Sequence, residues 1–182
     1  MREDPEAQAK LARMYRAGSG VKQDRKAALY WEWKAAVNGN ADSQFELGSA
    51  LENALSVQRD YARALAWYQK SAQQGDTDAE SALSRVYLQG LGVPQDYRQA
   101  VAWAIRTVWH GDSEAQYRVG LWYADGQGVR PNRIEAHKWL NLAASDAYGR
   151  AREARDALEQ KMTADEIASA QRLASTWKSG GR

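Results

Sequence analysis

The sequence predicts an all-α fold, a solenoid of four 36-residue helix-turn-helix repeats followed by a C-terminal helical cap. The first observation behind this is self-similarity, because a shift of 36 residues superposes the same residue types four times. The superposed sets are Trp31, Trp67, Trp103 and Trp139, and Leu11, Leu47, Leu83 and Val119. The other two observations are helix-type spacing of apolar residues and helix caps that recur at the same interval.

Each recurring tryptophan lies in a pattern typical of a helix with one buried face. In the first repeat, Ala28 precedes Trp31 by three residues, and Ala35 and Ala36 follow it by four and five. The later repeats keep the alanine and place Ser71-Ala72, Thr107-Val108 or Ala143-Ala144 after the tryptophan. Spacing of this kind places the side chains on one face, so each repeat is predicted to contain a helix around its tryptophan.

Recurring cap residues predict where the first helix of each repeat begins. They are Asp4, Asn40, Asp76 and Asp112, whose side-chain oxygens can accept from the free amides of a first helical turn. Pro5 suits the first helical position, where a missing N–H costs nothing. A glycine precedes each later cap, at Gly39, Gly75 and Gly111, where a left-handed residue ends the preceding helix.

A second set of caps predicts the second helix of each repeat, at Asp24, Asp60, Asp96 and Asn132. Glu135, three residues after Asn132, predicts a capping box. The turns before these caps contain two glycines each, Gly18 and Gly20, Gly90 and Gly92, and Gly126 and Gly128. Repeat two reads Ala54-Leu55-Ser56-Val57 instead, so its turn is expected to be either differently shaped or strained, at a cost of about 1 kcal/mol or more per residue at positive φ.

The C-terminal segment loses the repeat register but keeps a helical pattern. Ala151, Ala154, Leu158 and Met162 form one apolar stripe, and Thr163 with Glu166 predicts a capping box before a last helix. The predicted organisation is an N-terminal tail at 1–3, repeats at 4–39, 40–75, 76–111 and 112–147, capping helices at 148–178, and a flexible tail at 179–182.

The repeats resemble the Sel-one-like repeat, a relative of the tetratricopeptide repeat. In repeat four the matching residues are Ala115, Val119, Gly120, Tyr123, Gly126, Gly128, Val129, Asn132, Ala136, Trp139, Ala143 and Ala144. Repeat one matches through Ala7, Leu11, Ala12, Tyr15, Gly18, Gly20, Val21, Asp24, Ala28, Trp31, Ala35, Ala36 and Gly39. Repeat two departs at Ser43, Leu51 and its turn, and repeat three departs at Thr107-Val108.

This resemblance implies a right-handed superhelix of bacterial type, whose first helices line a concave groove, and a role as a scaffold or adaptor without chemistry of its own. Many such bacterial proteins are exported, so the resemblance favours a periplasmic location with a leader trimmed and Met1 added; a cytoplasmic location stays open. Some are immunity proteins that neutralise secreted toxins.

The composition excludes several classes of function. Twenty-five Lys and Arg against 23 Asp and Glu leave a formal charge of +2 without a basic block, so no nucleic-acid partner is expected. No cysteine is present, which excludes thiol catalysis and thiolate metal sites. No apolar run is long enough to cross a bilayer, and a monomer is expected.

Candidate chemistry is sparse, so no catalytic, cofactor-binding or metal-binding residue is predicted. His110 and His137 stand in different repeats without a ligand spacing, and the glycine pairs lack the rest of a phosphate-binding loop. Asp76 and Asp78 suggest the start of a calcium loop, but Tyr87 stands where that loop needs its last glutamate. The four motif tryptophans could stack on sugars or bases, and core packing is the favoured interpretation.

Residues on the far face of the first helices are the predicted partner-binding site, because the motif requires neither bulk nor apolarity there. The predicted apolar row is Phe45, Leu88, Tyr117 and Leu121, with Trp122 beside it and with Arg13, Arg16, Arg85 and Arg118 as flanking charges. An apolar row with an arginine rim is typical of a protein interface. The alternative is that curvature of the array or the cap buries part of the row.

The favoured function is a non-enzymatic scaffold or adaptor that binds a partner protein in its concave groove, such as an envelope protein, a regulator or a secreted effector. An immunity protein that neutralises a secreted toxin is an alternative within the same class. A carbohydrate or peptidoglycan binder of the cell envelope, or an enzyme, is the alternative from another class.

Overall fold

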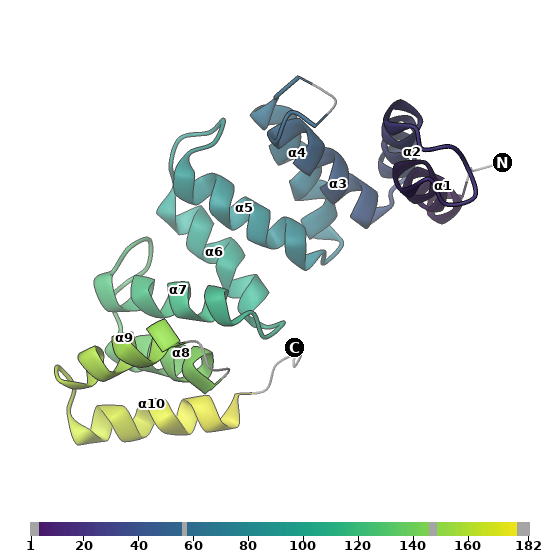
Figure 1. Cartoon of the computed structure of the whole chain (residues 1–182). Helices are drawn as coiled ribbons and strands as arrows, with labels where there is room; N and C mark the ends of the chain where they lie inside the picture. Colours follow the sequence, from purple (N-terminus) through teal and green to yellow (C-terminus); the bar gives the residue numbers. More distant parts are fainter. Residues whose placement is uncertain (1–3, 56–57, 146–148, 178–182) are drawn as a thin grey trace. The chain divides into compact units, whose positions relative to one another are not determined.

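Ten α-helices make up the computed structural model, which describes residues 4–55, 58–145 and 149–177 and contains no strand in those residues (Figure 1). The helices are α1 (Pro5–Ala17), α2 (Arg25–Val37), α3 (Ala41–Glu52), α4 (Tyr61–Gln73), α5 (Thr77–Gln89), α6 (Tyr97–Val108), α7 (Ser113–Asp125), α8 (Arg133–Ser145), α9 (Gly149–Glu159) and α10 (Ala164–Thr176). The all-α helical repeat fold is therefore confirmed. The expected tails at 1–3 and 179–182 lie outside the described residues.

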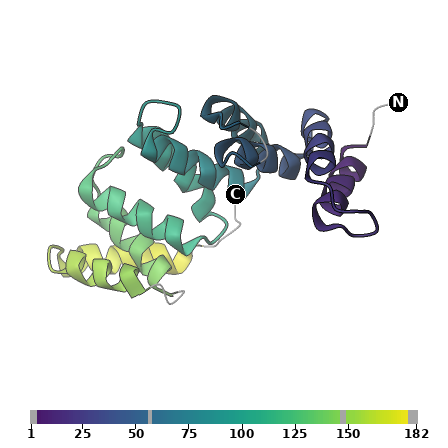
Figure 2. The ribbon, with the colours of Figure 1, turned by 45° about the horizontal axis from the view of Figure 1, so that its top comes forward.

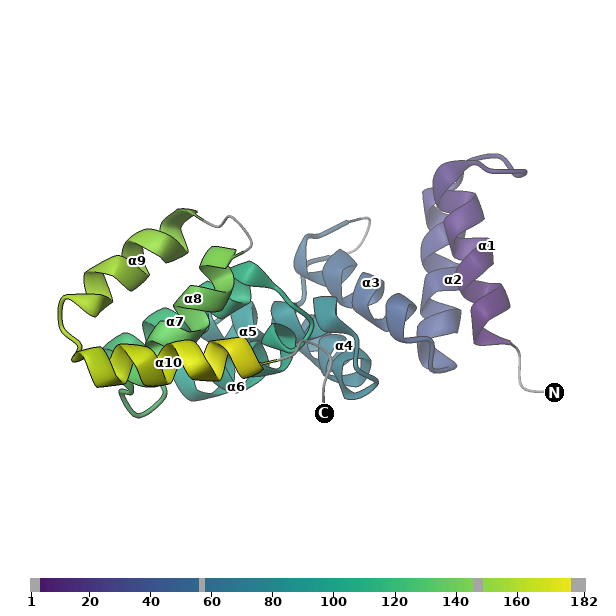
Figure 3. The same cartoon turned by 90° about the horizontal axis from the view of Figure 1, so that it is seen from below.

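The chain divides into two compact units. Unit 1 comprises Met1–Val86 and Gly90–Pro94, and unit 2 comprises Tyr87–Gln89 and Gln95–Arg182. In unit 1, α2 packs against α1 and α3, and α3 packs against α4; Figure 3 shows α1 and α2 side by side. In unit 2, α7 packs between α6 and α8, while α9 and α10 both pack on α8 (Figure 2). Each unit thus has its own layers of paired helices.

The predicted helix caps are all present in the structure. The side chain of each first-helix cap accepts a hydrogen bond from a backbone amide two or three residues later, as Asn40 does from Ser43 at 2.8 Å. The second-helix caps behave alike, and Thr163 with Glu166 forms the predicted capping box. Gly39, Gly75 and Gly111 have positive φ, which confirms them as helix-ending residues.

One further bond recurs in every repeat and closes the turn between its helices. The backbone N–H of each second-helix cap donates to a carbonyl near the end of the first helix, as Asn132 does to Tyr123 at 2.8 Å. The matching pairs are Asp24 to Tyr15, Asp60 to Leu51 and Asp96 to Tyr87. The predicted capping box at Asn132 is therefore wrong in one half: this amide is already used, and Glu135 accepts from Lys138 Nζ at 2.8 Å instead.

The turn of repeat two is strained at the position where the other repeats have glycine. Ala54 has φ +55°, and it aligns with Gly18, Gly90 and Gly126, whose φ values lie between 68° and 75°. The turn keeps the helix-ending hydrogen bond of the glycine turns, here from Leu55 N to Ala50 O at 2.9 Å. This bond requires a left-handed conformation at Ala54. The predicted strain is confirmed at this residue; Ser56 and Val57, the rest of the predicted segment, lie outside the described residues.

We expect Ala54→Gly to raise the free energy of unfolding by about 0.5–1 kcal/mol, because relief of left-handed strain exceeds the entropy that glycine adds to the unfolded chain. The control is Ala66→Gly at an exposed position in the interior of α4, which should lower stability by about 0.5–1 kcal/mol. Urea unfolding followed by circular dichroism measures both, and destabilisation by Ala54→Gly would contradict the assignment of strain.

The core of unit 2 is built around the motif residues of its two repeats. Trp139 is 5% exposed and packs with Val119 and Val101, and Trp177 from the end of α10 packs on the same cluster. The Trp177 ring lies 5.7 Å from that of Trp139 and 5.9 Å from that of Trp109, measured between centroids. The cap therefore contributes an aromatic side chain to the core that it closes.

Candidate partner-binding site in unit 1

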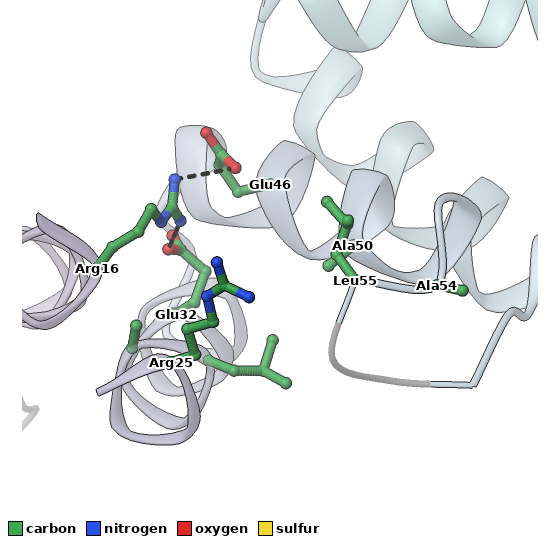
Figure 4. Close-up of a pocket in the computed structure, with 9 residues that line it drawn as sticks. Arg16, Arg25, Glu32, Glu46, Ala50, Ala54 and Leu55 are labelled. Atoms are coloured by element: carbon green, nitrogen blue, oxygen red, sulfur yellow. Dashed lines mark hydrogen bonds and ion pairs between the residues drawn. The ribbon is translucent and has the colours of Figure 1, made fainter. Parts of the chain in front are cut away.

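A charged cluster joins the first three helices of unit 1. The last turn of α1 presents Arg16, whose guanidinium forms an ion pair with Glu32 of α2 and another with Glu46 of α3, the latter at 3.2 Å (Figure 4). Glu32 is 5% exposed, and burial raises the pKa of its carboxyl, an effect that Arg16 opposes. Arg16 therefore serves as the counter-ion of a buried acid and ties α1 to its two neighbours.

A pocket of about 520 Å³ opens beside this cluster. Its lining, which we call the charged pocket, consists of Arg16, Arg25, Ala28, Leu29, Glu32, Glu46, Ala50, Ala54 and Leu55 (Figure 4). Arg25, in the first turn of α2, forms no ion pair with any residue that the structure describes. Leu55 is 59% exposed at the rim. The pocket thus combines an uncompensated cation with an apolar wall.

The repeat sequence explains why this pocket lies between repeats one and two. Further along the chain, a turn glycine packs tightly on the first residue of the preceding repeat's second helix: a Cβ at Gly92 would overlap Tyr61, and one at Gly128 would overlap the backbone of Tyr97. The junction of repeats one and two has neither member of this contact, because Arg25 stands in place of the tyrosine and the repeat-two turn contains no glycine. At this junction the contact between a tyrosine and a turn glycine is therefore missing, and Arg25 lines a pocket instead.

A second pocket, of about 310 Å³, shares Arg16, Glu32 and Glu46 with the first and is mainly acidic. Its remaining lining is Ala9, Arg13, Asp42, Ser43, Phe45, Asp76 and Asp78. Arg13 lies 3.9 Å from Asp42, with both side chains largely exposed. Burial raises the pKa of Asp76, and the negative charges of Asp78 and Asp42 add to this. Two adjoining pockets therefore flank Arg16, one with a free cation and one rich in carboxylates.

A second polar cluster ties α3 to α4 and α5. The Glu52 carboxylate, which is 7% exposed, accepts a hydrogen bond from the Tyr68 hydroxyl at 2.7 Å and a two-pronged pair from the Arg85 guanidinium, one arm at 2.8 Å. The hydrogen bonds from Arg85 hold the pKa of Glu52 below its ordinary value. Burial, with the bond to Glu52, raises the pKa of Tyr68. Both lone-pair sides of this buried carboxylate are thus satisfied.

The residues that sequence reasoning missed follow a pattern visible in the repeat alignment. One recurring position is Arg16, Glu52, Leu88 and Ala124, and its structural partner is Glu32, Tyr68, Ala104 and Leu140. Both positions are polar in repeats one and two and apolar in repeats three and four. Matched polarity at two positions 16 residues apart indicates contact, and this signal could have identified Glu32, Glu52 and Tyr68.

The sequence-predicted site residues divide between the units, and those of unit 1 are mostly engaged. Arg13 and Arg16 pair with acids of the acidic pocket, and Arg85 is bound by Glu52. Phe45 lines the acidic pocket and lies against Tyr68, with 5.7 Å between ring centroids. Three of these four residues, the arginines, therefore already have charged partners.

In unit 2 the predicted apolar row is largely packed, and Trp122 requires a correction. Trp122 is 5% exposed within the core cluster of Trp139, so no partner can reach it. Its ring was expected beside the groove, but α6 lies against that side of α7 and encloses it. Tyr117 and Leu121 pack on the cluster that includes Leu158 of α9.

Two further residues of the predicted set in unit 2, Leu88 and Arg118, also contact other parts of the unit. Leu88 packs against the Trp139 cluster. Arg118 lies 3.7 Å from Glu114, one turn earlier on α7, and its side chain is 29% exposed. The alternative, that the cap and the neighbouring repeats bury part of the row, therefore describes unit 2.

The four motif tryptophans each carry a cation against their ring. Lys34, Lys70, Arg106 and Lys138 lie 5.4, 4.3, 5.1 and 4.1 Å from the ring centroids of Trp31, Trp67, Trp103 and Trp139. Trp139 is buried, and the other three are half-buried. A ring face stacked on a cation is not open for a sugar or a base.

The described residues contain no group of three or more acidic, histidine or cysteine side chains placed to hold a metal ion. His137 is buried and its Nε2 lies 2.7 Å from Glu159 of α9, whereas His110 is exposed just after α6. Among the same residues, no helix combines the length and apolarity that a membrane span needs.

Paired, capped helices with side-chain clusters linking successive repeats define a helical repeat protein, and sequence comparison gives the family. A sequence profile of the Sel1 repeat matches residues 5–36, 41–76, 77–107 and 113–148. The chain belongs to the Sel1 repeat family, whose members are typically protein-interaction scaffolds.

Solved structures agree with this assignment. The chain is similar to a Sel1 repeat protein from Oxalobacter formigenes, with 28% identity, 96% of this chain and 71% of that one covered, and a TM-score of 0.76. It is also similar to c5321, a protective antigen of uropathogenic Escherichia coli, with 27% identity, coverage of 94% and 44%, and a TM-score of 0.53. The chain thus spans less than half of that antigen.

An immunity protein of Pseudomonas aeruginosa, Pa5087, matches at 23% identity over 82% of this chain and 55% of its own, with a TM-score of 0.46. That likeness is too low to transfer an immunity role to this chain. No curated protein matches the chain significantly in sequence.

Proposed function

We propose that this protein is a non-enzymatic scaffold that binds a partner protein through the charged pocket of unit 1. The observation that carries the proposal is Arg25, an uncompensated guanidinium at the rim of a pocket whose other charges are already paired. Membership of a family typical of interaction scaffolds supports the class of function.

The geometry favours a partner that inserts an acidic side chain with an apolar neighbour. Arg25 supplies a charge and a planar donor fork, and Ala28, Leu29 and Ala50 supply the apolar wall. Arg16 is held by Glu32 and Glu46, so it shapes the pocket while Arg25 supplies the attraction. Phe45 and Arg13, in the adjoining acidic pocket, extend the proposed surface.

We expect Arg25→Glu to weaken binding of the partner at least about tenfold, because the new carboxylate would face Glu32 and Glu46 as well as an acidic partner. Thermal unfolding should change little, since exposed substitutions usually alter stability by within about 0.5 kcal/mol. Immobilised wild-type and variant proteins, incubated with extract and compared by quantitative mass spectrometry, give the measurement.

The matched control is Lys26→Glu, which makes the same charge change one residue along the same exposed turn but outside the pocket. A protein retained by the wild type and by Lys26→Glu, but lost from Arg25→Glu, is the expected result. If every retained protein binds the Arg25→Glu variant equally well, the charged pocket is not the binding site.

A further inference from the structure

Unit 1 also exposes a large apolar surface on α2, away from the charged cluster. Tyr30, Trp33 and Val37 are 51%, 49% and 53% exposed. Tyr30 and Trp33 belong to a cleft of about 590 Å³, which we call the apolar cleft, lined by Leu29, Tyr30, Trp33, Leu47, Leu51, Arg63 and Trp67. It shares only Leu29 with the charged pocket. Large aromatic side chains that are half-exposed together indicate a surface that something covers.

The equivalent positions in unit 2, two repeats further on, are covered by packed side chains. A shift of 72 residues maps Leu29, Trp33, Leu47, Leu51 and Trp67 onto Val101, Ile105, Val119, Tyr123 and Trp139. All five of these unit 2 residues belong to, or pack against, one core cluster. Trp177 packs on that cluster too, with its ring against Trp139 in an edge-to-face contact. The chain therefore shows which kind of side chain this cleft accommodates.

Charge supports an occupant of the same kind. The apolar cleft is lined by residues of α2, α3 and α4. Helices α2 and α4 carry five Lys and Arg residues against one carboxylate, Glu32, which is buried beside Arg16, and the three carboxylates of α3 pair with arginines outside the cleft. Arg63 lines the cleft with a side chain that is 78% exposed and lies 3.3 Å from Asp60, the cap of the same helix, and Lys70 lies over the ring of Trp67. In unit 2 the helix that brings Trp177 to the cluster begins with two acids, Asp165 and Glu166.

We propose that the apolar cleft of unit 1 binds an amphipathic helix of a partner protein. This helix would insert an aromatic side chain into the cleft, in the way that Trp177 packs on the cluster of unit 2, and would also carry acidic residues. This surface shares only Leu29 with the charged pocket, and the proposal goes beyond the proposed function by assigning a second site and the chemistry of its ligand. Aromatic anchors are the residues that most often concentrate binding energy.

The probe is a synthetic peptide of residues 163–177, labelled with fluorescein at its N-terminus and titrated with the whole protein by fluorescence anisotropy. The peptide is not expected to displace α10 from unit 2, because α10 is tethered to that unit at a millimolar effective concentration. We expect saturable binding that weakens at least about tenfold when Trp33 is replaced by Glu, or when Trp177 of the peptide is replaced by Ala.

Gln69→Glu is the matched control, because Gln69 occupies the position of Trp33 in repeat two and does not line the cleft. It should bind the peptide as the wild type does, and circular dichroism melts should show both variants folded. Absence of a rise in anisotropy up to about millimolar protein, or equal binding by Trp33→Glu, would overturn the proposal. So would a concentration-dependent dimer in sedimentation that Trp33→Glu abolishes, because the cleft would then belong to a second copy. Each of these results leaves the Arg25 experiment unaffected.

Discussion

Replacing Glu52 with Gln is expected to lower the free energy of unfolding of unit 1 by about 2 kcal/mol at neutral pH, because Arg85 loses the counter-ion of a partly buried ion pair. The loss should depend on pH in a definite direction. The pKa of Glu52 lies below its ordinary value of 4.5 in the folded protein, so its contribution is complete above pH 4.5 and disappears as the pH falls below it. Urea unfolding at several pH values measures both effects.

The control for this prediction is Glu46→Gln, the same substitution on the same helix. Glu46 pairs with Arg16 at 3.2 Å, but its side chain is 44% exposed, so its removal should change stability by only about 0.5 kcal/mol. The wild type and Glu52→Gln should become progressively more alike in stability as the pH falls below 4.5. A gap between them that stays constant over the whole pH range would show that the ion pair is not the cause.

Replacing Trp139 with Ala should have the largest effect of any single change in unit 2, a loss of about 4 kcal/mol. The substitution empties the centre of the core cluster and removes the surface on which Trp177 packs. Because unit 1 has its own packing, we expect hydrogen exchange to accelerate in α6 to α10 and to remain slow in α3 and α4.

Trp67→Ala is the natural comparison, since the same motif residue is only half-buried beside the apolar cleft. Its loss should be about half as large or less, as less contact is removed. Equal losses for the two tryptophans would mean that position in the motif, and not burial, determines the contribution.

The backbone of this protein was largely predictable from its sequence, because local chemistry determines it. Asp24 and Asn40 cap helices through bonds to amides two or three residues away, which depend little on the rest of the fold. The positive φ of Ala54 follows from the alignment of its turn with the glycine turns. Even the error at Asn132 was local, since a backbone carbonyl competed successfully for the same amide.

The candidate site was less predictable, because it depends on which side chains successive repeats bring together. Trp122 was predicted beside the open face because it adjoins Leu121 in sequence, but a neighbouring helix packs against its ring and buries it. The charged pocket required knowing that Arg25 replaces a residue which elsewhere packs under a turn glycine. Contacts between repeats of this kind become visible in sequence only when equivalent positions are compared in pairs.

The pairing of Arg85 with Glu52 also restricts how the gene for this protein can change length. Loss of one whole repeat is the simplest way for a tandem array to shorten, and deletion of residues 40–75 would leave every cap and turn in register. It would also bring Arg85 behind repeat one, where Arg16 stands at the position of Glu52. Two arginines, Arg16 and Arg85, would then share the single carboxylate of Glu32, which stands at the position of Tyr68. The repeats are alike in backbone, yet their charges fix the order in which they can follow one another.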